Sequence, residues 1–221
     1  MMNEERVVFP TPGAADVPSA IKQNQQHRGW HFRGYLPHFD QPNLVQSINF
    51  RLYDSVPADV LENWKKELNL QEKTGAENPR LVKLRKRIAK YEDAGHGACF
   101  LKDTQIAGII QDALLHFDGE RYCLLAWCIM PNHVHVLAEM KKGYPLDKIL
   151  HSWKSFTSKE VNKILNRTGE FWMSEYYDRF IRDQRHFYYT KQYIENNPVA
   201  AGLCGRPEHW QFSSAFGKKL T

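Results

Sequence analysis

The feature that most constrains this chain is one segment rich in apolar residues, RYCLLAWCIMPNHVHVLAEM, which extends over residues 121–140. It predicts two strands joined by a tight turn at Pro131 and Asn132, which interrupt the apolar pattern. Side chains alternate between the two faces of a strand, so His133 and His135 leave one face together. Taken alone, the pair has two interpretations: metal-ligating imidazoles, or surface or core histidines with a structural role.

A second segment, QYIENNPVAAGL at residues 192–203, places Tyr193 four residues before Asn197. Residues i and i+4 share one face of a helix, so the phenol and the carboxamide are predicted to project together. Pro198 follows directly and disfavours helical backbone at Asn197, so the helix is predicted to end there. On its own, the segment is more typical of an ordinary amphipathic helix end with a packed tyrosine.

The remaining pattern predicts an α+β chain. Residues 1–26 lack a sustained period and are predicted to be a loose tail, followed by one domain over 27–221. Residues 27–40 are predicted to lie across the surface. Strands are predicted at 44–52, 170–172 and 180–181, and helices at 59–68, 80–91, 104–117, 146–165 and 186–196, with Thr104 as a cap and Phe156 facing inward. This order indicates an antiparallel sheet with helices packed on one face.

Composition excludes several classes of protein. The longest apolar run, Cys123–Met130, has eight residues and is far too short to cross a membrane. The N-terminus carries early acids and no apolar core, so no signal peptide is predicted. The four cysteines show no CxxC spacing, which indicates reduced, mostly buried thiols of a cytoplasmic protein. The net charge of +5 permits a nucleic-acid partner.

Together the two segments resemble the REP-associated tyrosine transposases, a branch of the single-tyrosine HUH endonucleases within the IS200-like transposase superfamily. HUH denotes histidine, hydrophobe, histidine, which the HVH at 133–135 fits. The family's MPNHVH block matches Met130–His135, and its YIxxNPV block matches Tyr193–Val199. Weaker similarity extends over about residues 33–215.

The resemblance implies a ferredoxin-like antiparallel sheet with helices packed on it and the histidine pair on a central strand. The helical content between residues 59 and 117 would be an elaboration of the first crossover. His133, His135 and the Asn197 carboxamide oxygen would hold Mg²⁺ or Mn²⁺, and Tyr193 would be the nucleophile. Its attack on a phosphodiester would leave a 5′-phosphotyrosine and a free 3′-hydroxyl, so rejoining would need no ATP.

The implied substrate is single-stranded DNA, in particular a palindromic repeat folded as a hairpin with a short recognition flank. The cations nearest the two motifs are the predicted phosphate contacts, namely Lys154, Lys159, Arg179, Arg182 and Arg185. The cations of residues 80–90 are interpreted as a solvated helix face. Trp30, Phe32 and Tyr35 lie among Arg28 and Arg33, and either stack on unpaired bases or pack on the core. The protein is expected to be a monomer or a homodimer.

One function of another class stays open, a non-catalytic protein derived from a transposase that binds single-stranded nucleic acid. The presence of His133, His135, Tyr193 and Asn197 together argues against it, because a pure binder needs none of them. A histidine-triad nucleotide hydrolase would need histidine at position 137, where the chain has Leu137. A zinc hydrolase would have only Glu139 as a further ligand on the histidine face.

Overall fold

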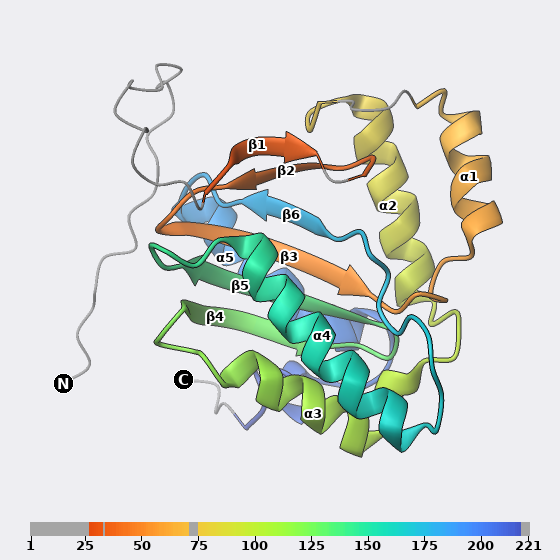
Figure 1. The fold of residues 1–221 in the computed structure, drawn as a ribbon, viewed down its shortest axis with the longest axis vertical. Coiled ribbons are helices and arrows are strands. Elements are labelled where there is room, and N and C mark those ends of the chain that lie inside the picture. The colour runs from red at the N-terminus through yellow and green to blue at the C-terminus, as the bar shows by residue number, and fades with distance from the viewer. Residues whose placement is uncertain (1–26, 33, 71–74, 218–221) are drawn as a thin grey trace.

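A computed structural model describes residues 27–32, 34–70 and 75–217, and its centre is a four-stranded antiparallel sheet (Figure 1). The strand order is β4-β5-β3-β6, from β3 (Leu44–Arg51), β4 (Tyr122–Ile129), β5 (His133–Met140) and β6 (Tyr177–Phe180). A separate hairpin of β1 (Gly29–Phe32) and β2 (Pro37–Asp40) lies beside β6. The predicted tail, residues 1–26, and Arg33 lie outside the described residues.

The connections make the sheet ferredoxin-like. β3 leads through α3 (Thr104–Leu115) to the edge strand β4, and β5 leads through α4 (Leu146–Ile164) to the opposite edge strand β6. The two first strands of these units, β3 and β5, pair at the centre, with His135 opposite Asn49 and His133 opposite Arg51. The predictions of a ferredoxin-like α+β fold and of a central strand for the histidine pair are therefore confirmed.

Helices cover both faces of this sheet. Val134 and Val136 are fully buried in the larger core, on the face covered by α3 and α4. On the opposite face, Leu137 packs with Ile194 of α5 (Gln184–Ala200). Figure 1 shows α3 and α4 in front of the sheet and α5 behind it. The prediction of helices on one face only is therefore wrong, because the apolar residues on the histidine face also require cover.

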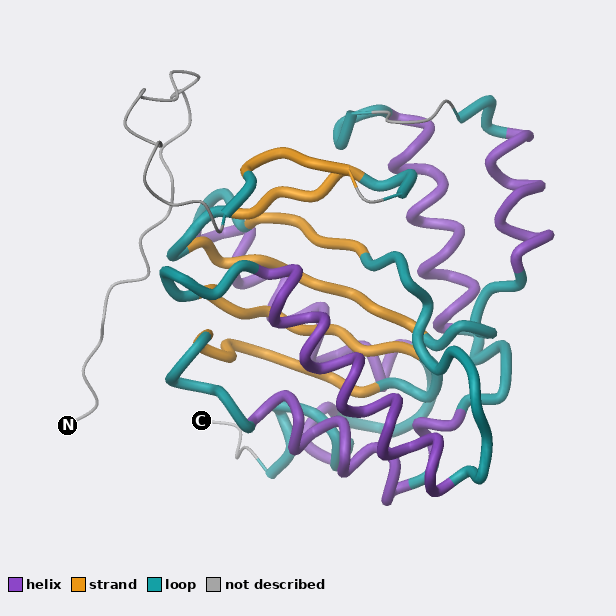
Figure 2. Tube along the Cα trace, viewed as in Figure 1, coloured by secondary structure: helices purple, strands orange, loops and turns teal. Residues whose placement is uncertain are grey.

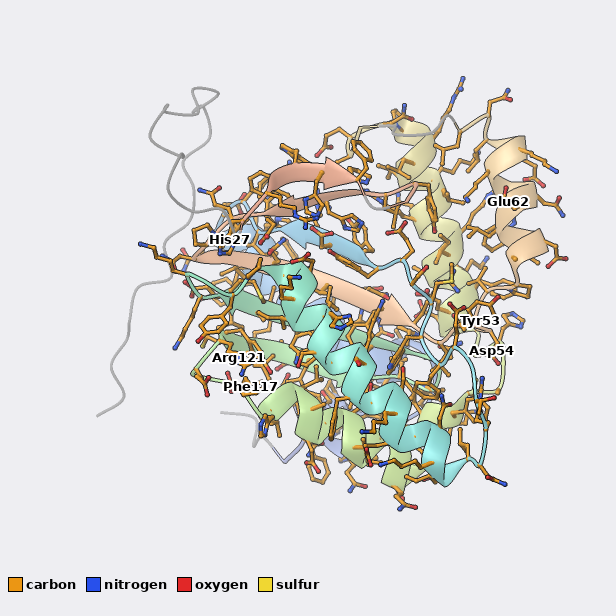
Figure 3. The ribbon with its side chains drawn as sticks, viewed as in Figure 1. His27, Tyr53, Asp54, Glu62, Phe117 and Arg121 are labelled. Atoms are coloured by element: carbon orange, nitrogen blue, oxygen red, sulfur yellow. The ribbon has the colours of Figure 1, made fainter. Side chains whose placement is uncertain are left out.

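Two further helices, α1 (Ala58–Glu67) and α2 (Pro79–Asp93), are inserted between β3 and α3 and stand beside the sheet (Figure 2). They have a small core of their own that includes the fully buried Leu81 and Leu84. The segment that follows α2 is tied back to the end of β3, where Asp54 accepts a 2.7 Å hydrogen bond from the Ala98 amide. Figure 3 shows Asp54 beside the lower end of α2. The insertion lies within the range, residues 59–117, where an elaboration of the first crossover was predicted.

Glycine is required at position 97, where the segment after α2 contacts Asp54. Gly97 has φ +83°, and a Cβ there would lie 2.8 Å from the Asp54 carbonyl oxygen. The close approach of these two backbone segments therefore fixes where the last turn of α2 meets the sheet.

Several local predictions are corrected by the structure. Within residues 27–40, predicted to lie across the surface, Gly29–Phe32 and Pro37–Asp40 pair as the β1–β2 hairpin, and His38 is fully buried. Asp103, not Thr104, caps α3, because its carboxylate accepts from the amides of Gln105 and Ile106. In the 170–172 segment, Trp172 forms only an isolated bridge, and the sixth strand is Tyr177–Phe180.

Two predictions about helix faces and ends are also wrong. Phe156 is 51% exposed, since the buried stripe of α4 passes through Trp153 and Thr157 instead. The α5 helix continues through Pro198 to Ala200, because a proline removes one donor while the Ala201 amide still reaches the Asn197 carbonyl.

The structure also bears on the predictions about membrane spans and cysteines. No helix in the described part of the chain combines the length and apolarity that a membrane span requires. Of the four cysteines, Cys99 and Cys128 are buried, so the prediction of mostly buried thiols holds for half of them.

Candidate active site

The two histidines of β5 converge on one point. Both side chains are buried, and their Nε2 atoms lie 3.0 Å apart. His133 Nδ1 lies 2.7 Å from Asn132 Oδ1, which can only accept a hydrogen bond. The ring proton of His133 is thus held on Nδ1, which leaves the Nε2 lone pair directed into the site.

Burial keeps both imidazoles neutral. It lowers the pKa of His133 well below its usual value, with a further contribution from neighbouring His135, and it lowers the pKa of His135 to about 4. Neutral imidazole is the form that binds a metal ion. Two facing, neutral imidazole nitrogens in a buried position are therefore suited to a shared cation.

The Asp93 carboxylate adds an oxygen to this pair. Asp93 is the last residue of α2, and its carboxylate oxygen and the two ring nitrogens lie within 4.8 Å of one another. The distance from Asp93 Oδ1 to His133 Nε2 is 3.7 Å. Two imidazole nitrogens and one carboxylate oxygen form a donor set that suits a divalent ion such as Mn²⁺ or Mg²⁺.

Asn197, predicted from sequence as a ligand, lies next to the same point. Its side chain is 3% exposed, and its Nδ2 lies 3.1 Å from His135 Nε2. Its Oδ1 is buried and has no hydrogen-bond partner among the described residues. A buried amide oxygen without a partner, on the residue that touches His135, fits a site made for a cation.

Tyr193 lies one helical turn before Asn197, at the edge of the cluster. Its ring centroid is 5.6 Å from that of His135, and its side chain is half exposed. Burial first, and then the Asp93 charge, raise the pKa of the phenol to about 12, although a hydrogen bond with Asn197 lowers it. The α5 helix thus presents a protonated phenol beside the histidines.

A buried ion pair supports the last turn of α2. The Glu92 carboxylate lies 3.5 Å from Arg51 Nε and 3.3 Å from Asn49 Nδ2. Asn49 Nδ2 is also 3.4 Å from His135 Nδ1. Burial raises the pKa of Glu92 to about 7, against the opposing effect of Arg51. These contacts connect α2 to β3 and β5 and hold Asp93 in reach of the histidines.

A groove of about 460 Å³ extends from this cluster along β6. Its lining includes His135 and Tyr193 at one end and two of the predicted DNA contacts, Arg179 and Arg182. Arg185 lies outside the lining and places its guanidinium 5.5 Å from the centre of the Tyr189 ring. The structure therefore brings two of the three predicted arginines to the site.

The two predicted lysines are separated from the site by the sheet. Lys154 and Lys159 belong to α4, which covers the face opposite the histidines. The Lys154 ammonium donates to the carbonyls of Met173 and Ser174 at 2.8 and 3.1 Å. By contrast, Arg85 and Lys86 of α2 line the groove, so the cations of residues 80–90 are not only a solvated face.

Sequence reasoning missed Asp93 and Glu92. Two signals were present: Glu92 falls on the buried stripe that starts at Leu81 and Leu84, and both acids stand in the last turn of a helix, where the dipole favours cations. Their distance of about forty residues from the histidines concealed the connection.

One family model matches part of this chain. Residues 103–197 match the family model described as IS200-like transposase. The matched range runs from the cap of α3 to Asn197, and includes both histidines and Tyr193. This part of the chain is therefore similar to the IS200-like transposases. No curated protein matches this chain.

Two solved structures are similar to this chain. One is a REP-associated tyrosine transposase bound to a REP hairpin, with 13% sequence identity and a TM-score of 0.50, and the match covers 83% of this chain and 81% of that one. The other is a candidate transposase from Deinococcus radiodurans, with 14% identity and a TM-score of 0.29, covering 76% of this chain and 96% of that one. The first likeness supports the fold described above.

Proposed function

We propose that this protein is a transposase of the IS200-like type, which nicks single-stranded DNA and rejoins it through a covalent bond to Tyr193. The observation that carries the proposal is the juxtaposition of the Tyr193 phenol with the Asp93, His133 and His135 cluster at one end of a groove. A protein that only binds nucleic acid has no use for a nucleophile beside a candidate metal site.

His133, His135 and Asp93 would hold a divalent ion, Mg²⁺ or Mn²⁺, with Asn197 as a further oxygen donor once its amide is turned so that Oδ1 faces the site. When bound, such an ion polarises the scissile phosphate and reduces the charge repulsion that opposes attack by a tyrosine oxygen.

The residues of α5 would carry the covalent chemistry. Tyr193 Oη forms a bond to phosphorus as the bond from phosphorus to the 3′ oxygen breaks. The phenol releases its proton and the leaving oxygen gains one, which gives a 5′-phosphotyrosine and a free 3′-hydroxyl. The reverse step, with the 3′-hydroxyl of a second end, joins the DNA and frees Tyr193. The hydrogen bond with Asn197 orients the phenol and favours its ionised form.

The proposed substrate is an unpaired strand beside a hairpin. The REP-associated relative was solved with a REP hairpin, and we extend that class of substrate to this chain as part of the proposal. A groove of about 460 Å³ is too small for a duplex. Bending a duplex sharply into it would require on the order of 1–6 kcal/mol, whereas an unpaired strand bends with little resistance.

The test compares three substrates of one sequence at one salt concentration: single strand, hairpin with an unpaired flank, and perfect duplex. We expect nicking of the first two in Mg²⁺ or Mn²⁺, no nicking of the duplex, and none of any substrate in chelator. Equal cutting of the duplex, or full cutting in chelator, would contradict the proposal. Binding without any nicking would identify a non-catalytic binding protein.

A further inference from the structure

The groove beside the candidate active site has a second end, which the covalent chemistry leaves unused. This end is formed by the rings of Trp30, Phe39 and Phe180. We propose that the groove holds the unpaired strand next to the bond to be cut, with one base stacked on Trp30. The inference rests on the proposed function, and it names the part of the protein that would recognise the unpaired strand.

The Trp30 ring is exposed to solvent but packs on two other aromatic rings. Its side chain is 56% exposed, yet its ring centroid lies 5.0 Å from that of Phe39 and 6.3 Å from that of Phe180. The rings of Phe39 and Phe180 are 5.3 Å apart. Unpaired bases stack on large aromatic rings of this kind, which pack against the protein on one side and are exposed to solvent on the other.

The hairpin that carries Trp30 is anchored to the sheet. His38 of β2 is fully buried, and its ring nitrogens contact the carboxylates of Asp178 and Glu175, the latter at 3.0 Å. The Phe39 amide donates to Asp178 at 3.1 Å. Trp30 is therefore fixed relative to β6, and through β6 relative to β3 and the histidine site.

The walls between the two ends carry exposed positive charge. Lys86 of α2 and Arg179 and Arg182 at β6 line the groove, and none of the three forms an ion pair within the described ranges. Of the four acidic residues in the lining, Glu175 and Asp178 are paired with His38, Glu92 is paired with Arg51, and Glu77 is exposed. The three exposed cations outnumber this one exposed carboxylate, so the middle of the groove is complementary to a phosphate backbone.

The size of the groove favours unpaired nucleotides over a paired duplex. Its volume of about 460 Å³ lies within the range of roughly 300–1,000 Å³ typical of small-ligand pockets. This is room for one or two nucleotides with their bases turned out, and a paired base could not reach the Trp30 ring.

The experiment measures binding in chelator, where the strand cannot be cut. The probes are a fluorescein-labelled palindromic hairpin alone and the same hairpin with an unpaired flank on either side. Trp30→Ala should weaken binding of the flanked hairpin by about tenfold and leave binding of the bare hairpin unchanged. Trp30→Phe should retain much of the affinity, because a smaller ring still stacks.

Phe156→Ala is the matched control, because Phe156 is 51% exposed on α4, on the opposite face of the sheet. It should bind both probes like the wild type. Equal binding of the flanked hairpin by Trp30→Ala and wild type would overturn the inference and leave the proposed function standing. Equal weakening of both probes would overturn it as well, since the effect would not depend on the unpaired flank. A wild type that binds neither probe would overturn both proposals.

Discussion

At the scale of single residues, the site is assembled from side chains that are poorly placed for stability alone. His133, His135 and Asn197 are buried polar groups, and one of their polar atoms, Asn197 Oδ1, has no partner in the described structure. Asp93 puts a negative charge at the negative end of the α2 dipole. Groups that lower stability in one place are expected where function requires them.

The Asp93→Asn variant separates the contribution of Asp93 to metal binding from its unfavourable interaction with the α2 dipole. Removing the charge should weaken Mn²⁺ binding by at least about tenfold, measured by titration calorimetry, because one oxygen ligand becomes neutral. The metal-free protein should be no less stable, and thermal unfolding in chelator should show a gain of about 0.3–1 kcal/mol from relief of the dipole. Glu62→Gln, at an exposed position on α1, should change neither quantity. Unchanged Mn²⁺ affinity would remove Asp93 from the ligand set.

At the scale of elements, the β1–β2 hairpin depends on one buried histidine. Burial lowers the pKa of His38, but hydrogen bonds and charge from Asp178 and Glu175 outweigh this and raise it above 6.5. The other groups that face the ring are Tyr176, at 4.3 Å between centroids, and His31, at 5.6 Å. The protonated form is therefore the one that holds the hairpin to β6.

The His38→Gln variant tests this anchor. It should lower the free energy of unfolding by roughly 3 kcal/mol at pH 6, because two buried carboxylates lose their charged partner. A raised pKa means that the contribution is complete below pH 6.5 and is lost as the pH rises through the value in the folded protein. The difference between variant and wild type should thus shrink on the alkaline side. A difference that stays constant or grows with pH would show that His38 is held neutral. His116→Gln, at an exposed position, is the control.

Elements with a long, regular hydrophobic period could be predicted from the sequence. The 121–140 hairpin, the helices that became α1 to α4, and an antiparallel sheet all follow from local pattern, whereas the ferredoxin-like arrangement was implied by the family resemblance. The β1–β2 hairpin was missed, because its strands have four residues each and its stability comes from His38 contacts with residues 140 positions away. The end of α5 was misplaced, since packing on the sheet outweighs the local preference before Pro198.

For the candidate site too, local pattern does not reveal contacts between segments that are distant in sequence. The motifs at 130–135 and 193–199 located His133, His135, Tyr193 and Asn197, which the structure brings together. Asp93 and the groove required the position of α2, which no local pattern specifies. Lys154 and Lys159 were assigned from nearness in sequence, but the buried stripe of α4 directs that helix to the other face.

At the scale of the whole molecule, the sheet divides the protein into a face that carries the site and a face closed by α3 and α4. The net charge of +5 is modest, so the position of the cations matters more than their number. Arg179 and Arg182 lie on the groove side, whereas Lys159 lies on the α4 side.

This division predicts which cations contribute to salt-dependent binding. For single strands, the slope of log K against log salt is about −0.7 per phosphate contact. The double variant Arg179→Gln/Arg182→Gln should therefore reduce the magnitude of the slope by about 1.4 if each arginine meets one phosphate. Lys159→Gln should leave the slope as in the wild type, and fluorescence anisotropy over a salt series measures both. A larger effect from Lys159→Gln would place the DNA on the opposite face.

The most direct test of the account is the identity of the tyrosine that becomes linked to DNA. A hairpin substrate labelled at its 3′ end should transfer the label to the protein in Mg²⁺ or Mn²⁺, and peptide mapping should find the adduct on Tyr193. Tyr193→Phe should bind the same substrate with nearly unchanged affinity, because only a hydroxyl is lost, and should form no adduct. An adduct that persists in Tyr193→Phe, or that maps to Tyr188 or Tyr189 on the same helix, would contradict the assignment of the nucleophile.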